Sequence, residues 1–126
     1  SSGVDTDFTA KLVDVWPNGF AQNLTEGIIR ARYRDSREKP DLINPGQVYK
    51  FTIDLWATAN VFKKGHTLRL EVSSSNFPRF DRNLNNGAMR YLKSSDAGAS
   101  VVTATNVVLH DAEHPSALVL AIVPAK

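Results

Sequence analysis

Closely spaced turn signals divide the chain into apolar runs that are each about as long as one β-strand. Glycine, proline and asparagine recur between these runs, from Pro17-Asn18-Gly19 to Ala97-Gly98. Apolar and polar side chains alternate along residues 47–57, and residues 66–73 repeat this alternation. A period of two residues places the apolar side chains on one face of a half-buried strand. The pattern predicts strands over residues 8–15, 47–57, 66–73, 101–109 and 117–123.

Short strands separated by frequent turns are typical of an all-β sandwich or barrel. A length of 126 residues corresponds to one domain with one core. We therefore expect a single β-sandwich domain over residues 1–126. The sequence contains no cysteine, which excludes disulfides, thiolate zinc sites and a cysteine nucleophile.

Residues 25–38 fit two interpretations. A helix would begin at a Thr25 cap, whereas a strand would place alternate residues on opposite faces. We favour the strand, because Gly27 is unfavourable in the first turn of a helix and the neighbouring runs are β. The strand would have an apolar face of Ile29, Ala31 and Tyr33 and a basic face of Arg30, Arg32 and Arg34.

The charge balance indicates which partners the chain lacks. Lysine and arginine exceed aspartate and glutamate by 15 − 13 = 2, which is too balanced for nucleic acid or an anionic membrane. The arginine row could bind phosphates, but it carries no interleaved aromatic residues and is more typical of a solvated face or a surface that meets carboxylates. No apolar run approaches the about 20 residues of a membrane span. No signal peptide precedes the first strand, which favours a cytoplasmic location.

The residues that could carry chemistry do not form a recognised catalytic pattern. The strand–turn–helix signature G-x-S-x-G of a nucleophilic serine is absent, and a catalytic triad would have to use His66, His110 or His114. We therefore expect no catalytic residue and no cofactor in this chain.

Two short acidic or histidine-containing stretches were considered as metal sites. Residues 110–114 contain two imidazoles and two carboxylates, but Pro115 argues against a helix that would bring His110 and His114 to one face. Asp5-Thr6-Asp7 could offer oxygens to calcium but lacks the calcium-loop pattern, and we expect these carboxylates to be solvated. We expect no bound metal.

Residues 73–100 contain little patterned sequence and are expected to form an ordered loop with a role in binding or docking. Exposed loops seldom carry aromatic residues that pack on nothing. The loop either folds back on its own sandwich, with Asp81 paired to Arg79 or Arg82, or it contacts another domain. The candidate docking residues are Asn76, Phe77, Pro78, Arg79, Phe80, Asp81 and Arg82.

Several blocks of the sequence together resemble one family. They are residues 5–15 (DTDFTAKLVDV), 21–34 (AQNLTEGIIRARYR), 45–46, 51–56, 60–62, 65–66, the 73–85 loop and 110–115, in that order. This sequence is similar to the C-terminal domain of the cocaine esterase and X-Pro dipeptidyl-peptidase group of serine hydrolases. The similarity extends over nearly the whole chain.

The resemblance implies a jelly-roll β-sandwich, similar to galactose-binding domains, that accompanies an α/β-hydrolase catalytic domain. The catalytic triad of that family lies in the hydrolase domain, so none of its residues is carried onto this chain. The sandwich is then expected to brace the catalytic domain, in cis or in trans, and to help wall its active-site cleft. The loop at residues 76–82 is the expected docking surface.

The resemblance also implies that further strands precede Asp5 in the family, so this chain would be a partial domain. Ser1-Ser2 resembles either the tail of such a strand or a remnant of a tag. A sandwich without those strands would expose sheet edges, and exposed edges pair with other chains. We therefore expect a homo-oligomer where no catalytic domain covers them.

Two other functions remain open. A jelly roll can bind carbohydrate or small ligands, with Trp16, Trp56 and Tyr91 as stacking platforms, although tryptophans are expected to pack in the core. An enzyme could also be assembled across an oligomer with His110 or His114.

Overall fold

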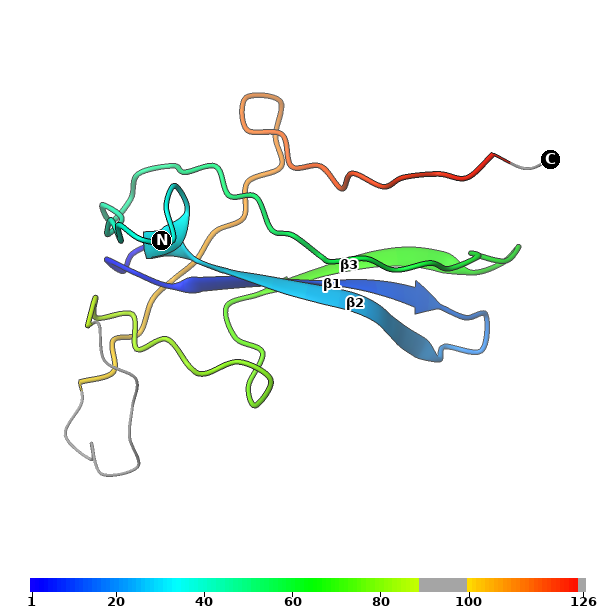
Figure 1. The fold of residues 1–126 in the computed structure, drawn as a ribbon, viewed down its shortest axis with the longest axis horizontal. Helices are drawn as coiled ribbons and strands as arrows, with labels where there is room; N and C mark the ends of the chain where they lie inside the picture. Colours follow the sequence, from blue (N-terminus) through cyan, green and yellow to red (C-terminus); the bar gives the residue numbers. More distant parts are fainter. Residues whose placement is uncertain (89–99, 125–126) are drawn as a thin grey trace.

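The computed structural model describes residues 1–88 and 100–124. It contains β1 (Asp7–Val15), β2 (Ala21–Arg30), a 3₁₀ turn η1 (Ala31–Tyr33) and β3 (Thr67–Ser73). The strands form one antiparallel 3-stranded sheet in the order β2-β1-β3, so the strand that comes first among these three in the sequence is the central one (Figure 1).

β1 is central because nearly all of its side chains find cover. Phe8, Ala10 and Leu12 are buried on the face that we call the inner face. Thr9 and Lys11 point to the opposite, outer face, and Thr9 is also buried. Because β1 is buried on both faces, apolar and polar residues alternate less clearly along β1 than along residues 66–73.

The hairpin between β1 and β2 ends in a tight turn and contains a β-bulge. Gly19 adopts a φ of 87°, which lies in the left-handed region that glycine tolerates without steric cost. Leu12 pairs with Thr25 but Val13 pairs with Asn23, so Leu24 is the extra residue.

Residues 47–57 cross the inner face without joining the sheet. The ring of Phe51 lies 4.9 Å from that of Phe8, and the hydroxyl of Thr25 donates a hydrogen bond to the carbonyl oxygen of Leu55. The backbone of this segment approaches β2 so closely that a Cβ atom on Gly27 would lie 1.9 Å from the carbonyl oxygen of Asp54. Only glycine permits this crossing.

The structure corrects several sequence-based expectations. Residues 47–57, 101–109 and 117–123 are not paired as strands in the described structure, because no neighbouring strand completes their backbone hydrogen bonds. The strand favoured for residues 25–38 is confirmed as far as Arg30, where η1 turns the chain out of the sheet. The arginine row on one strand face is therefore wrong for Arg32 and Arg34.

The inner face remains uncovered at β3. Leu68, Leu70 and Val72 pair with Asp14, Leu12 and Ala10, so they continue the apolar row of the central strand. The β3 side chains are nevertheless exposed, and β3 is an edge strand of the described sheet. In Figure 1, residues 111–124 also run apart from the sheet. The described part of the chain holds no helix that is able to span a membrane.

Candidate functional site

Asp7 at the start of β1 pairs with Arg30 at the end of β2, and Asp5 before β1 pairs with Arg32 of η1. The carboxylate of Asp7 accepts hydrogen bonds from Nε and Nη2 of Arg30 at 2.8 and 3.0 Å. One step further, the carboxylate of Asp5 accepts from Nε and Nη2 of Arg32 at 2.8 and 2.6 Å and from its backbone N–H at 3.0 Å. Asp5 and Asp7 are buried, so the expectation that they are solvated is wrong.

The loop after β3 completes this cluster. The side-chain amide of Asn83 donates to Oδ2 of Asp5 and to Oδ1 of Asp7, each at 2.8 Å. The carboxylate of Asp81 accepts from Nη2 of Arg30 at 3.3 Å. The acidic pair is therefore neutralised by the chain's own donors, and the described residues contain no group of His, Asp or Glu that could hold a metal.

Arg30 is held as a permanent cation. Its hydrogen bond with Asp7 raises the pKa of the guanidinium further above its ordinary range, against the opposing effect of burial. The charges of Asp7 and Asp81 act in the same direction. An arginine held in this way positions chain segments and does not exchange protons.

The candidate docking residues 76–82 lie over the outer face of β2. Glu26 is the main anchor: its carboxylate accepts a hydrogen bond from Nδ2 of Asn76 at 2.8 Å and forms an ion pair with Arg79, whose Nε lies 2.7 Å from Oε1. Asp81 pairs with Arg30, and not with Arg79 or Arg82 as one interpretation of the sequence had it. The loop thus folds back on its own sheet.

Two side chains of this loop still face outward. Phe77 is 67% exposed, and the side chain of Arg79 is 65% exposed although it pairs with Glu26. The guanidinium of Arg79 lies 5.7 Å from the centroid of the Phe80 ring. The loop that folds back on the sheet therefore keeps Phe77 and Arg79 exposed on its outer side.

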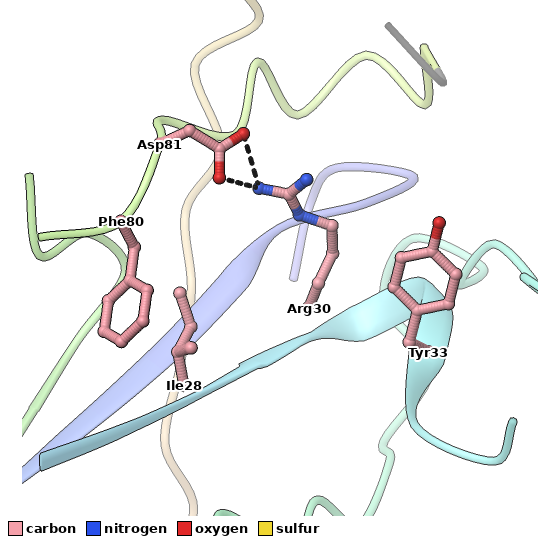
Figure 2. A pocket seen from close by; sticks show the side chains of 5 residues that line it. All are labelled: Ile28, Arg30, Tyr33, Phe80 and Asp81. Atoms are coloured by element: carbon pink, nitrogen blue, oxygen red, sulfur yellow. Dashed lines mark hydrogen bonds and ion pairs between the residues drawn. The ribbon is translucent and has the colours of Figure 1, made fainter. Parts of the chain in front are cut away.

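A shallow cavity of about 160 Å³ opens between the loop, β2 and η1. In Figure 2, Phe80 of the loop and Tyr33 of η1 lie on opposite sides of it, with Ile28 and Arg30 of β2 between them. Asp81 completes the lining and holds Arg30 through the contacts that are drawn as dashed lines. The cavity thus combines two aromatic rings with one ion pair.

A second polar cluster lies at the other end of β1. Nδ1 of His66 lies 2.9 Å from Oδ1 of Asp14, and the amide of Asn60 donates to Oδ2 of Asp14 at 3.4 Å. The Trp16 ring lies 5.2 Å from the His66 ring and covers it. This arrangement resembles the base and acid of a triad, but no serine hydroxyl is recorded in contact with His66 in the described residues.

Residues 110–114 form a polar turn, and the described residues bring together no group of three or more His, Cys, Asp or Glu side chains that could hold a metal ion. Nδ1 of His114 lies 3.1 Å from Oδ1 of Asp111. Hydrogen bonds from the backbone N–H of His114, and also of Glu113, hold the pKa of the Asp111 carboxyl below its ordinary value. The interpretation of this stretch as a turn is supported, and His110 takes no part in the contact.

Neither of the two tryptophans that could stack on carbohydrate lies in the core. Trp16 is 39% exposed and Trp56 is 80% exposed, so the expectation that tryptophans pack in the core is wrong for the described residues. Trp56 also adopts a φ of 64°, a left-handed conformation that is unusual for a bulky residue. Tyr91 lies outside the described residues.

Sequence reasoning missed the pairing of Asp5 and Asp7 with the arginines, although a signal was present. Residues that face one another across an antiparallel pair have constant summed numbers, and Asp7 and Arg30 share a sum of 37 with Asp5 and Arg32. The hairpin turn at Gly19 lies midway between the two sets. The opposite charges were therefore a signal, but the bulge at Leu24 shifts the register by one residue, and the turn alone would have matched Asp7 with Ile29.

Comparison with known proteins identifies a family and a curated relative with a similar sequence. Residues 1–119 match the family described as the X-Pro dipeptidyl-peptidase C-terminal non-catalytic domain. The cocaine esterase of Rhodococcus sp. (strain MB1 Bresler) is 49% identical over 123 residues, which cover 98% of this chain and 21% of that enzyme. The chain therefore spans about a fifth of the length of this curated relative.

Two solved structures have a fold similar to that of this chain. An aminopeptidase from the marine sediment archaeon Thaumarchaeota archaeon has a TM-score of 0.66 and 33% identity, over 69% of this chain and 16% of that one. An alpha-amino acid ester hydrolase has a TM-score of 0.64 and 34% identity, over 70% of this chain and 16% of that one. The predicted all-β, jelly-roll β-sandwich class and the predicted family are confirmed. The chain belongs to the C-terminal non-catalytic domain family of the X-Pro dipeptidyl-peptidases and related ester hydrolases.

Proposed function

We propose that this chain is the accessory domain that braces an α/β-hydrolase catalytic domain and helps to wall its active-site cleft. The observation that carries the proposal is the uncovered apolar row on β3. Leu68, Leu70 and Val72 are 41%, 40% and 42% exposed, although they continue the buried row of β1. Full burial of such a side chain contributes about 1.5–3 kcal/mol, so a row of them favours a covering partner.

Residues 117–123 extend the same argument. Every side chain in this segment is apolar, and Val119, Ile122 and Val123 are 90%, 85% and 91% exposed. Segments of strand length that are apolar on both sides are normally buried on both faces of a sheet. The segment therefore needs neighbours that the described residues do not supply.

The length of the relative supports a covering surface that comes from the rest of a longer enzyme. The matched segment is 21% of the cocaine esterase, so most of that enzyme lies outside it and is available to cover these side chains. The loop at residues 76–82 supports the same contact, because an exposed phenylalanine and arginine on an ordered loop are typical of domain interfaces.

The free edge of β3 favours one alternative covering. An unpaired edge strand is a template for pairing with another chain. In the absence of a catalytic domain, a second copy would pair along β3 and give a homo-oligomer. Light scattering of the purified chain at micromolar concentration would then detect no monomer.

A chimeric enzyme tests the bracing role. The matched segment of the Rhodococcus cocaine esterase is replaced by this chain, and ester hydrolysis and the half-life at elevated temperature are compared with the intact esterase and with a truncated esterase that lacks the segment. We expect the chimera to recover the activity and half-life that the truncated form loses. A truncated form as active and long-lived as the intact enzyme, or a chimera no better than the truncated form, would overturn the proposal.

A further inference from the structure

The cavity beneath the docking loop has a size and a lining that match one aromatic ring. Its volume is about 160 Å³. An enclosed apolar cavity of about 150 Å³ binds benzene, and this pocket, which is open to solvent, offers a similar volume to a ring that enters from outside. Ile28, Tyr33 and Phe80 supply apolar and aromatic walls here.

Arg30 contributes a planar guanidinium group to the lining of the cavity, and an aromatic ring could stack on its face. Its Nε and Nη2 atoms donate to Asp7 and Asp81, and such hydrogen bonds lie along the edge of the planar guanidinium group. No ring of the described residues lies over the Arg30 guanidinium, whereas Arg34 lies over Tyr49 and Arg79 over Phe80. No aromatic ring of the described residues therefore occupies either face of Arg30, and its side chain is 21% exposed.

The charges around the cavity favour a neutral ligand. Arg30 and Arg79 are balanced by nearby carboxylates of Asp7, Asp81 and Glu26. A cation would meet two arginines and an anion would meet the carboxylates. An uncharged ring that stacks on the guanidinium face is repelled neither by the arginines nor by the carboxylates.

We propose that this cavity binds an aromatic side chain that projects from the hydrolase domain, with the ring held between Phe80 and Tyr33 and stacked on Arg30. The inference rests on the proposed bracing role and names one of its contacts. The ring comes from the part of the parent enzyme that lies outside the matched segment, because the docking loop that forms one wall is the surface proposed to face it.

The first test uses the chain itself with a defined probe. N-acetyl-phenylalanine amide is titrated in an NMR experiment, and N-acetyl-cyclohexylalanine amide serves as the matched probe without a π system. We expect saturable shifts of the Ile28, Arg30 and Tyr33 amides, with two- to fivefold weaker binding of the cyclohexyl probe, which corresponds to about 0.5–1 kcal/mol for an exposed cation–π contact. Equal binding of both probes, or no saturable shift, would overturn the proposal.

Two variants separate this cavity from other exposed aromatic sites. Phe80→Ala removes one wall and should abolish the shifts, whereas Phe20→Ala removes an exposed ring (55% exposed) outside the cavity and should leave them unchanged. In the chimeric esterase, Phe80→Ala should shorten the thermal half-life and Phe20→Ala should not. Should Phe80→Ala fail to fold, Tyr33→Leu serves in its place. Equal effects of the cavity and control variants would refute the inference.

The outcomes distinguish the two proposals. A chimera that shows no recovery refutes the bracing role, and the probe titration then still reports on the cavity. A chimera that recovers activity but is insensitive to Phe80→Ala keeps the bracing role and refutes the contact proposed here.

Discussion

The buried ion pair between Asp5 and Arg32 should show a large coupling energy. Their side chains are 0% and 4% exposed, and their closest atoms lie 2.6 Å apart. Replacing one partner leaves the other as a buried charge without its counter-ion, which costs about 3–5 kcal/mol. A domain of this size is stable by about 5–15 kcal/mol, so either single replacement removes a large fraction of its stability.

The perturbation is a double-mutant cycle of Asp5→Leu and Arg32→Met. Each single variant should lose about 3–5 kcal/mol, and the double variant should lose less than the sum of the two, because it leaves no buried charge without its counter-ion. Asn83 keeps its second acceptor, Asp7, in every variant. The free energy of unfolding is measured by urea titration, followed by tryptophan fluorescence at one fixed protein concentration.

An exposed ion pair on the same sheet provides the control. Arg69 and Glu71 of β3 lie 3.3 Å apart, and their side chains are 49% and 46% exposed. The same cycle at this pair should give a coupling of no more than about 1 kcal/mol. Additive losses at Asp5 and Arg32, or a coupling there no larger than at the control pair, would refute the reasoning from burial.

Three further outcomes are expected from the same unfolding assay. Gly27→Ala should cost more than about 2 kcal/mol, because its Cβ atom would lie 1.9 Å from a carbonyl oxygen of the crossing segment; a loss below 1 kcal/mol would mean that the crossing shifts easily. Trp56→Asn should raise the free energy of unfolding by up to about 1 kcal/mol, because asparagine tolerates a φ of 64° better than tryptophan does; a clear loss would contradict this. His66→Ala should cost about 1–3 kcal/mol, because the buried carboxylate of Asp14 loses a partner at 2.9 Å. His114→Ala, at an exposed turn, is its control and should change the value by less than about 0.5 kcal/mol.

The strands that pair within the chain could be predicted from the sequence. The predicted ranges 8–15 and 66–73 differ from β1 and β3 by one residue each. Both runs contain enough local pattern to specify their faces, and their neighbours lie within the described residues. The run at residues 47–57 has the clearest alternation of all, yet it is not paired. Periodicity reports which side is apolar, but it does not report whether a neighbouring backbone is present.

The polar contacts of the site could be predicted only in part. The composition of residues 76–82 predicted a docking loop, but it did not predict the anchors of that loop. These anchors, Glu26 and Arg30, lie on a strand about fifty residues earlier. A local pattern carries no information on such distant pairs. The Asp5–Arg32 pair could not be predicted from the hairpin turn alone, because the bulge at Leu24 shifts the register by one residue between the turn and this pair.

The order of the strands has a consequence for synthesis on the ribosome. β1 needs β3 as its second neighbour, but 73 − 30 = 43 residues separate the end of β2 from the end of β3. At about 5–20 residues per second, the nascent hairpin waits roughly 2–9 s with one edge open. Among the described residues that follow β2, the crossing segment, residues 47–57, is the first to cover the inner face of the hairpin. A substitution that weakens this crossing, such as one at Gly27, should therefore lower the yield of folded protein during translation. The fall in yield should be larger than the loss in the free energy of unfolding alone would predict.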